Sequence, residues 1–164
     1  MIFTWTDYQH EHEKETETWT DEDTIKFAIN STIKNEHEYY MKICDYDGHD
    51  YVHNDTYFCK IVTDGDIIVA VLFLLRDDKC PRGSVTINPI IVNPKLRNRG
   101  NCTKIVGALV KNADKIIGYG TNVFEAGIDA NNPASIKAFE KAGFVHYETH
   151  ADGDYFYYRY TNAQ

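Results

Sequence analysis

The sequence predicts an α/β fold, or α+β, in which one mixed, mostly antiparallel β-sheet of about seven strands carries helices on both faces. Three observations lead to this prediction. The 164 residues fit a single domain spanning 1–164, and 43% of them are hydrophobic and 26% charged, as in globular proteins. Short β-branched runs and segments of helical periodicity alternate along the chain. Their order is a β-meander, a βαβ unit, a helix and a closing hairpin, which packs as one mixed sheet between helices.

The first third of the chain is polar and acidic. Residues 2–5 are expected to form a short edge strand, and an acidic stretch follows at 11–23. Thr20 is a good N-cap with Asp23 at the capping-box position, so a helix is expected over 20–33, with a second helical piece at 39–43. His49 and His53 lie in an acidic loop at 45–55, but their spacing fits neither a zinc motif nor a calcium loop. We expect no metal site there.

The middle of the chain predicts a meander. The apolar runs 57–62 and 67–75 flank Asp64-Gly65, a strong hairpin signal. The next strand is expected at 85–92, and it contains Pro89. Proline cannot donate to a sheet ladder, so Pro89 predicts a local distortion of that strand.

The second half predicts two helices and three further strands. A helix is expected from about Thr103 to Ile116, followed by a buried strand at 123–128. Pro133 suits the first turn of a helix that continues over 135–141 and stops at Gly143. The last two strands, 144–149 and 155–160, flank Asp152-Gly153 and form the closing hairpin.

One stretch combines a strand, a glycine-containing turn and a helix start, the arrangement that makes a cradle for phosphate. The apolar run ends at Pro94, the chain turns through Arg97 to Gly100, and an apolar-periodic segment follows. Unpaired N–H groups converge at such a helix start, where the helix dipole is positive. Gly100 leaves room for a ligand to meet the backbone. Many such turns bind nothing, but Arg97 and Arg99 favour a phosphate, since guanidinium suits it.

Charge and cysteine content narrow the function. The formal net charge of −8 argues against a nucleic-acid partner and fits a cationic small molecule or peptide. No apolar run is long enough for a membrane span, and the first residues lack the regions of a signal peptide, so a cytoplasmic location is expected. The four scattered cysteines are expected to be free thiols. Cys102 stands at a helix start, which can lower a thiol pKa; the alternative is a small residue facing the turn.

Two motifs resemble those of the GNAT N-acetyltransferase superfamily. Residues 92–102, Val-Asn-Pro-Lys-Leu-Arg-Asn-Arg-Gly-Asn-Cys, are similar to the acetyl-CoA loop (Arg/Gln)-x-x-Gly-x-(Gly/Ala), with Cys102 in place of Gly or Ala and Asn101 in place of an apolar residue. Residues 132–144, Asn-Pro-Ala-Ser-Ile-Lys-Ala-Phe-Glu-Lys-Ala-Gly-Phe, resemble the second signature of the family. The resemblance covers roughly residues 67–160.

The resemblance implies transfer of acetyl from acetyl-CoA, as co-substrate, to an amine by direct attack. Carried over residue by residue, it implies that the backbone of Ile90, Ile91 and Val92 bonds the pantetheine arm, and that Asn132 and Ser135 lie beside the reactive end. It also implies that a run of backbone amides holds the pyrophosphate: Arg97, Asn98, Arg99, Gly100, Asn101, Cys102 and Thr103. A strand distorted at Pro89 would leave unpaired groups for this ligand.

Glu125 is the candidate base for the acceptor amine, because it lies in an otherwise apolar strand where a carboxylate is costly without a function or a partner. The alternative is a strand residue paired with Lys or Arg. Phe139 stands where many family members have a tyrosine that resembles a general acid, and phenylalanine donates no proton. Solvent or another tyrosine then has to supply the proton to the departing thiolate. Tyr119, Tyr147 and the run 155–158 are candidates for walls of the acceptor site.

The sequence leaves several functions open. The favoured acceptor is a small cationic amine of aminoglycoside or polyamine kind, in keeping with the acidic N-terminal half. The alternatives are a non-catalytic acyl-CoA-binding or regulatory protein, which Phe139 supports, and an acetyltransferase acting on protein N-termini. The expected partners are acetyl-CoA and an amine, with no nucleic acid and no membrane. Members of the family often form dimers, so a homodimer stays open.

Overall fold

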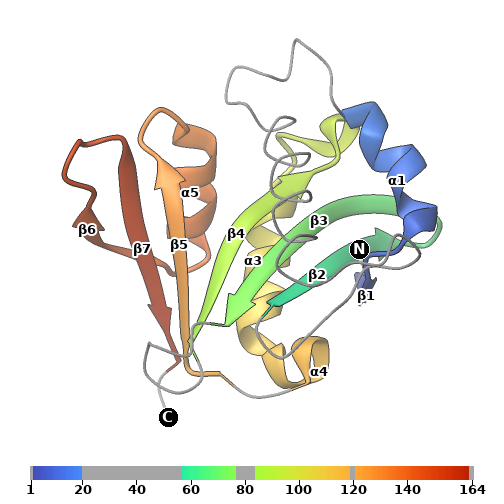
Figure 1. Cartoon of the computed structure of the whole chain (residues 1–164), viewed down its shortest axis with the longest axis horizontal. Coiled ribbons are helices and arrows are strands. Elements are labelled where there is room, and N and C mark those ends of the chain that lie inside the picture. Colours follow the sequence, from blue (N-terminus) through green and yellow to red (C-terminus); the bar gives the residue numbers. More distant parts are fainter. Residues whose placement is uncertain (1, 20–56, 77–83, 119–120, 163–164) are drawn as a thin grey trace.

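The computed structural model describes residues 2–19, 57–76, 84–118 and 121–162. They form a seven-stranded sheet in the order β1-β2-β3-β4-β5-β7-β6. Within this described sheet the neighbouring strands are antiparallel, except that β4 and β5 run parallel. The predicted fold class, a mixed and mostly antiparallel sheet with helices, is therefore confirmed (Figure 1).

The meander begins at one edge of the sheet. β1 (Thr4–Asp7) lies two residues farther along than predicted and pairs with β2 (Tyr57–Asp64). β2 and β3 (Ile67–Arg76) form the predicted hairpin, and its turn contains Gly65 at a φ of 58°. Turns of this tight kind favour glycine, because other residues rarely adopt a positive φ.

β4 (Ser84–Val92) is distorted where Pro89 predicted it. Its register against β3 steps from Ile87↔Leu74 to Ile90↔Leu72, so the segment Asn88-Pro89 of β4 stands opposite a single β3 residue. This is a β-bulge, a common way to place a proline inside a paired strand. The strand bends here, before the residues that lead into the cradle.

The crossover from β4 to β5 contains more helical segments than the sequence predicted. A short 3₁₀ helix, η3 (Pro94–Leu96), precedes α3 (Asn101–Lys111), and α4 (Ala113–Ile117) leads to β5 (Val123–Asp129). The prediction of one helix over 103–116 was wrong at both its start and its middle. Asn112 breaks it, because this residue leaves helical geometry at φ −129° and its backbone and side-chain N–H groups cap the Ala108 carbonyl.

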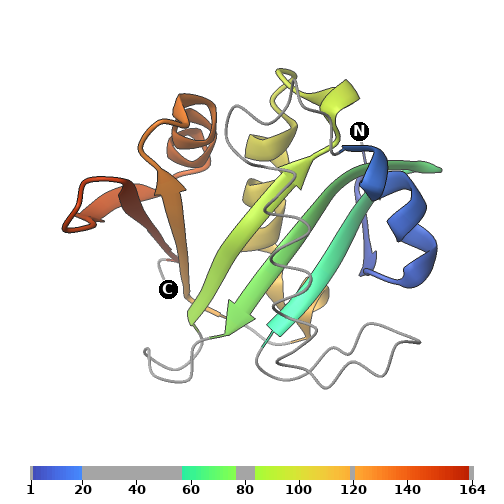
Figure 2. The same cartoon turned by 45° about the horizontal axis from the view of Figure 1, so that its top comes forward.

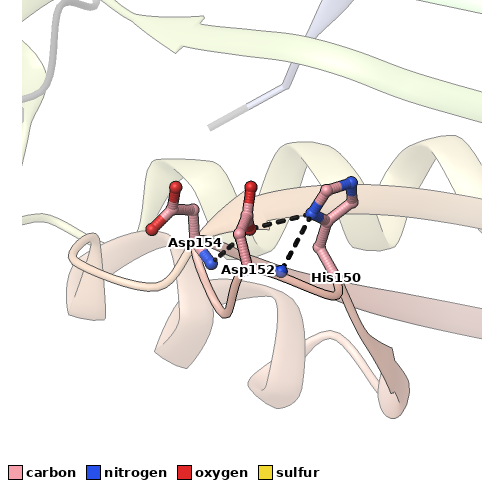
Figure 3. A network of polar contacts seen from close by, with 3 residues as sticks. All are labelled: His150, Asp152 and Asp154. Carbon is pink, nitrogen blue, oxygen red and sulfur yellow. Dashed lines mark hydrogen bonds and ion pairs between the residues drawn. The ribbon is translucent and has the colours of Figure 1, made fainter.

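The C-terminal elements match their predictions closely. α5 (Pro133–Lys141) starts with proline in its first turn, and β6 (Val145–Thr149) and β7 (Tyr155–Thr161) form the closing hairpin. Figure 3 shows the turn of that hairpin. The Asp152 carboxylate accepts from the Asp154 backbone N–H at 2.9 Å and contacts His150 Nδ1 at 2.8 Å.

Two hydrophobic clusters lie on opposite faces of the sheet, as the alternation of side chains along β3 requires. Leu72 and Leu74 join the larger cluster, which includes residues of α3, α4 and α5. Val71 and Phe73 join the smaller one together with Trp19, at the end of the segment formed by α1 (His10–Thr16) and η1 (Glu17–Trp19). Helical segments thus contact both faces, as predicted.

Several predictions fall outside the described residues. These are the helix capped by Thr20, the helical piece at 39–43, the loop at 45–55 with its two histidines, and the side chain of Tyr119. Cys59 and Cys102 are described, and neither forms a disulfide with another described residue. In the parts of the chain that the structure covers, no helix has the length and apolar character to cross a membrane.

Candidate active site

The sheet opens between β4 and β5. Among the described residues of these strands, the parallel pairing runs from Ser84↔Val123 to Ile87↔Ala126 and ends there. Beyond that point the two strands diverge in a V, which both views of the fold show (Figure 1 and Figure 2). The end of β4 therefore keeps one neighbour, β3, and its other side is open.

The register against β3 decides which backbone groups of β4 face the opening. Asn93 donates its N–H to a β3 carbonyl at 2.8 Å, which makes Val92↔Ala70 a non-hydrogen-bonded pair. Ile91 is then bonded to β3, whereas the N–H and C=O groups of Ile90 and Val92 point toward the gap. Of the three residues expected to bond the pantetheine arm through their backbone, Ile90 and Val92 have the right direction and Ile91 does not.

Arg97 turns back onto this opening. Its Nε donates to the Val92 carbonyl at 3.2 Å, and its Nη2 is buried and has no hydrogen-bond partner among the residues that the structure describes. Burial lowers the pKa of the Arg97 guanidinium. A buried donor with no partner is costly and favours an acceptor atom brought by a ligand. Arg99 is exposed and does not line this region.

The turn before α3 has the conformation of a cradle. Asn98 and Gly100 both adopt a positive φ, of 61° and 76°. The first bond of the helix joins the Lys104 N–H to the Gly100 carbonyl, 3.1 Å away. The preceding N–H groups, through Thr103, therefore have no partner within the helix and point out of its N-terminus. A Cβ on Gly100 would meet no protein atom within 4 Å. Glycine is therefore needed here for its positive φ, and not because neighbouring protein atoms leave no room for a side chain.

The two departures from the family motif have structural explanations. Asn101 is buried and donates from Nδ2 to the Leu96 carbonyl at 3.0 Å, so it fastens η3 to the start of α3. Cys102 is mostly buried, and burial raises the pKa of its thiol to about 12. Of the two roles open to Cys102, the structure therefore supports the small residue facing the turn, because burial disfavours the thiolate. Cys102 is a small, protonated side chain at the turn.

These groups line a cavity of about 590 Å³ between β4, the turn, α3 and α5. Thr103 ties two of its walls together by donating from Oγ1 to the Ala138 carbonyl of α5, at 3.3 Å. Among the described residues that line it, Arg97, Lys137 and Lys141 are cationic, and none is a carboxylate. We call it the basic groove. Of the expected cofactor residues, the ones that line it are Ile90, Ile91, Val92, Arg97, Asn98, Gly100, Asn101, Cys102, Thr103, Asn132 and Ser135.

Asn132 and Ser135 lie at the start of α5. Asn132 is its N-cap, and its Oδ1 accepts from the Ser135 N–H at 3.2 Å. The cap fixes where α5 begins and so places this wall of the groove. Lys137 and Lys141 of the same helix were missed by the sequence reasoning. Their spacing of four residues on one helix face is the signal that could have found them.

A second cavity, of about 550 Å³, lies on the C-terminal half of the sheet. Phe124 and Ala126 of β5 point into the large core, so alternation turns Glu125 and Gly127 to the opposite face, away from α3 and α5. We call this cavity the acidic pocket, because the described residues that line it include two carboxylates and no cation. Its lining residues are Thr86, Glu125, Ala126, Gly127, Tyr147, Glu148, Tyr155 and Tyr157.

Glu125 of the acidic pocket has a partner. Arg159 of β7, its direct cross-strand neighbour, donates to Glu125 Oε1 from Nε at 3.0 Å and from Nη2 at 2.7 Å. The structure thus contains the ion pair that the sequence analysis held as the alternative to a base. It also brings Glu125 to a cavity wall, so the two roles do not exclude each other. Arg159 was missed, since finding it requires the β5–β7 register.

Phe139 belongs to the core. It is 3% exposed and packs edge-on against Phe144, with 5.0 Å between ring centroids. It lines neither the basic groove nor the acidic pocket. Three phenols do line the acidic pocket, those of Tyr147, Tyr155 and Tyr157. Among the residues that the structure describes, no group of three metal-ligating side chains is close enough to hold an ion.

Two parallel strands that separate beside a helix N-terminus, with a basic groove on one side, form an arrangement suited to an extended anionic ligand. Comparison with known proteins gives the class. The profile of the acetyltransferase (GNAT) family matches residues 5–144. The chain therefore belongs to the GNAT family of acetyltransferases, as its two motifs indicated, and the predicted enzyme class is confirmed.

Solved structures agree in fold. The aminoglycoside acetyltransferase AAC(6')-Ib with coenzyme A and kanamycin superposes with a TM-score of 0.72 at 16% identity, covering 98% of this chain and 95% of that one. Spermidine N-acetyltransferase from Vibrio cholerae, with CoA and spermine, gives 0.71 at 13% identity, covering 97% and 95%. The N-acetyltransferase PseH from Campylobacter jejuni gives 0.66 at 13%, covering 99% and 100%. A search of curated protein sequences finds no match.

Proposed function

We propose that the protein transfers the acetyl group of acetyl-CoA to an amine of a small cationic molecule, of aminoglycoside or polyamine kind. One observation carries the proposal: a basic groove and an acidic pocket lie beside the same opening in the sheet. The groove contains Ile90, just past the point where β4 and β5 separate, and the pocket contains Ala126, the last paired residue of β5. An anionic donor and a cationic acceptor would meet there.

The groove suits the two polar parts of acetyl-CoA. The backbone groups of Ile90, and the N–H of Val92, point toward the gap and present a strand edge to the amides of the pantetheine arm. The free N–H groups at the start of α3 suit the pyrophosphate, with the dipole of an eleven-residue helix behind them. Asn132 and Ser135 would lie beside the reactive end. In their solved structures, AAC(6')-Ib is bound to coenzyme A and the spermidine enzyme to CoA.

The reaction needs a proton acceptor beside the amine. The neutral amine nitrogen attacks the thioester carbonyl carbon, the N–C bond forms, and the C–S bond breaks with its electron pair leaving on sulfur. The amine proton goes to Glu125, directly or through water. Aromatic faces in the pocket attract organic cations, which favours an acceptor that enters charged.

The leaving group needs little help. A thiol with a pKa of about 8.5 is a tolerable leaving group as thiolate near neutral pH. Phe139 therefore does not prevent turnover, even though a positioned acid contributes on the order of 10²–10⁴-fold. Solvent, or one of the three tyrosines of the acidic pocket, would supply the proton.

The first experiment is a thermal-shift titration with acetyl-CoA, with coenzyme A and ATP as comparisons. A ligand at one hundred times its dissociation constant stabilises the fold by about 2.7 kcal/mol. We expect a shift with acetyl-CoA and coenzyme A and none with ATP. Equal shifts with all three, or no shift at all, would contradict the proposal.

Turnover is then measured as thiol release with spermidine, kanamycin and a peptide with a free N-terminus. We expect one of the two small polycations to be acetylated. Acetylation of the peptide alone would favour the N-terminal acetyltransferase, and CoA binding without turnover would favour a non-catalytic protein. A single domain over 1–164, a cytoplasmic location and a homodimer stay predictions.

A further inference from the structure

We infer that Arg159 is a positioning residue, which holds Glu125 by one carboxylate oxygen so that the other is free to act on the acceptor amine in the acidic pocket. This inference rests on the proposed function. Arg159 lies on β7, directly opposite Glu125 of β5. It is not among the residues that line the pocket, so it would act through Glu125 and not on the substrate.

The hydrogen bonds show how the carboxylate is held. An arginine facing a carboxylate often bonds both oxygens, one with each arm of its fork. Here Nε at 3.0 Å and Nη2 at 2.7 Å both donate to Oε1 of Glu125. Oε2 receives neither bond. The pair therefore fixes the orientation of the carboxylate without using the second oxygen, which an ordinary fork-to-fork pair would use.

Arg159 is itself fixed from the other side. Its guanidinium carbon lies 4.2 Å from the centroid of the Tyr147 ring, within the range of a cation–π contact. The hydrogen bonds to Glu125 raise the pKa of the Arg159 guanidinium, so the cation is permanent. Tyr147, Arg159 and Glu125 thus form a row across β6, β7 and β5. The side chains at its two ends, Tyr147 and Glu125, both line the pocket.

Exposure fits a positioning role better than a purely stabilising one. The side chain of Glu125 is 19% exposed and that of Arg159 is 45% exposed. Ion pairs exposed to this extent add little to stability. The other edge of the sheet offers a matched pair: Lys60 of β2 contacts Asp7 of β1, its direct cross-strand neighbour, at 2.6 Å. That pair lines neither cavity.

The test is a double-mutant cycle of Glu125→Gln and Arg159→Met, with Lys60→Met as the control. Turnover is measured with acetyl-CoA and with spermidine and kanamycin as probe acceptors. Glu125→Gln should lower kcat on the order of 10²–10⁴-fold. Arg159→Met should lower kcat about 10²-fold, as misplaced catalytic groups do, and leave the KM for acetyl-CoA unchanged.

Non-additivity identifies the mechanism. If Arg159 acts through Glu125, the double variant should be no slower than Glu125→Gln alone. Arg159→Lys keeps the charge but loses the two-pronged geometry of the guanidinium, so it should recover only part of the rate. It also serves as a second variant in case Arg159→Met folds poorly. Lys60→Met should keep the wild-type kcat.

Two results would overturn the inference while leaving the proposed function intact. One is a wild-type kcat in Arg159→Met. The other is a loss in the double variant equal to the product of the single losses. A wild-type protein that binds acetyl-CoA but acetylates neither probe contradicts the proposed function instead, and the inference then falls with it.

Discussion

The basic groove and the acidic pocket are about the same size, near 590 and 550 Å³, and lie beside the same opening, yet they are built differently. The groove is made by one continuous run from β4 to α3 together with α5, and it includes the backbone N–H groups at the start of α3 that have no partner within the helix. The pocket is made by side chains of four strands, β4 to β7. Binding through backbone groups tolerates many side-chain substitutions in the protein, whereas binding through side chains depends on the identity of each residue.

The largest effect on the binding of acetyl-CoA is expected from the turn of the groove. Gly100→Ala places an L-residue at a φ of 76°, which costs about 1–2 kcal/mol. If the free turn relaxes to another conformation, acetyl-CoA must restore the original one on binding. Its affinity should then fall about five- to thirty-fold, as measured by calorimetric titration.

Gly118→Ala is the matched control for this change. Gly118 follows α4 at a φ of 84°, and a Cβ there also meets nothing within 4 Å, but the residue does not line the groove. It should lose similar stability and keep its affinity for acetyl-CoA. Equal losses of affinity in both variants would show that the turn contributes only through general stability.

The two cavities also differ in how well the sequence predicted them. Most of the residues predicted to bind the cofactor do line the groove, because each part of it is encoded in a short stretch of sequence. These parts are Gly100, the bulge at Pro89 and the start of α5 at Asn132. The pocket was found only as Glu125 and some tyrosines. Its shape depends on the β5–β7 register, which sets Arg159 against Glu125 and which no local pattern encodes.

The charge of the groove gives the next effect. Lys137 and Lys141 are exposed on α5 and line the groove. An exposed ion pair contributes about 0.2–1 kcal/mol, so the double variant Lys137→Gln/Lys141→Gln should bind acetyl-CoA about two- to thirty-fold more weakly. The difference should shrink at high salt, because screening weakens exposed pairs.

Lys115→Gln is the control, since Lys115 is an exposed lysine of α4 that lines neither cavity. It removes one positive charge, as each of the two groove substitutions does, and should leave the affinity for acetyl-CoA unchanged. A loss as large as that of a groove lysine would mean that only the net charge matters.

The wall of the pocket gives a smaller effect on the acceptor alone. A Cβ on Gly127 would lie 3.3 Å from Tyr157 Cε1 and 3.5 Å from Cδ1, so the ring rests on the bare backbone. Gly127→Ala should push this ring into the pocket and raise the KM of the acceptor a few-fold, with the affinity for acetyl-CoA unchanged. Gly107→Ala in α3, where a Cβ meets nothing, should instead add up to about 1 kcal/mol of stability. If the acceptor KM of Gly127→Ala is unchanged, the Tyr157 ring takes no part in acceptor binding.

Burial bears on two of the sequence interpretations. Of the two roles open to Cys102, it favours the small residue facing the turn, because the side chain is mostly buried and the pKa of its thiol rises. Phe139, which stands where many family members have a tyrosine, lies in the core beside Phe144. The depth of both side chains is set by tertiary packing, which local sequence does not reveal.

The smallest effect is expected at the hairpin turn beyond the pocket, between β6 and β7 (Figure 3). The Asp154 N–H, and then the contact with His150, hold the pKa of the Asp152 carboxyl below its usual range. A lowered folded pKa contributes stability that is present above the unfolded pKa of about 3.9 and is lost as pH falls through the folded pKa.

Asp152→Asn should therefore have a slightly lower Tm than the wild type at pH 6, and the two melting curves should converge as the pH falls below about 4. A difference that stays constant with pH would mean that the turn is held by its backbone bonds alone. Affinity for acetyl-CoA should not change, because the turn contributes nothing to the groove.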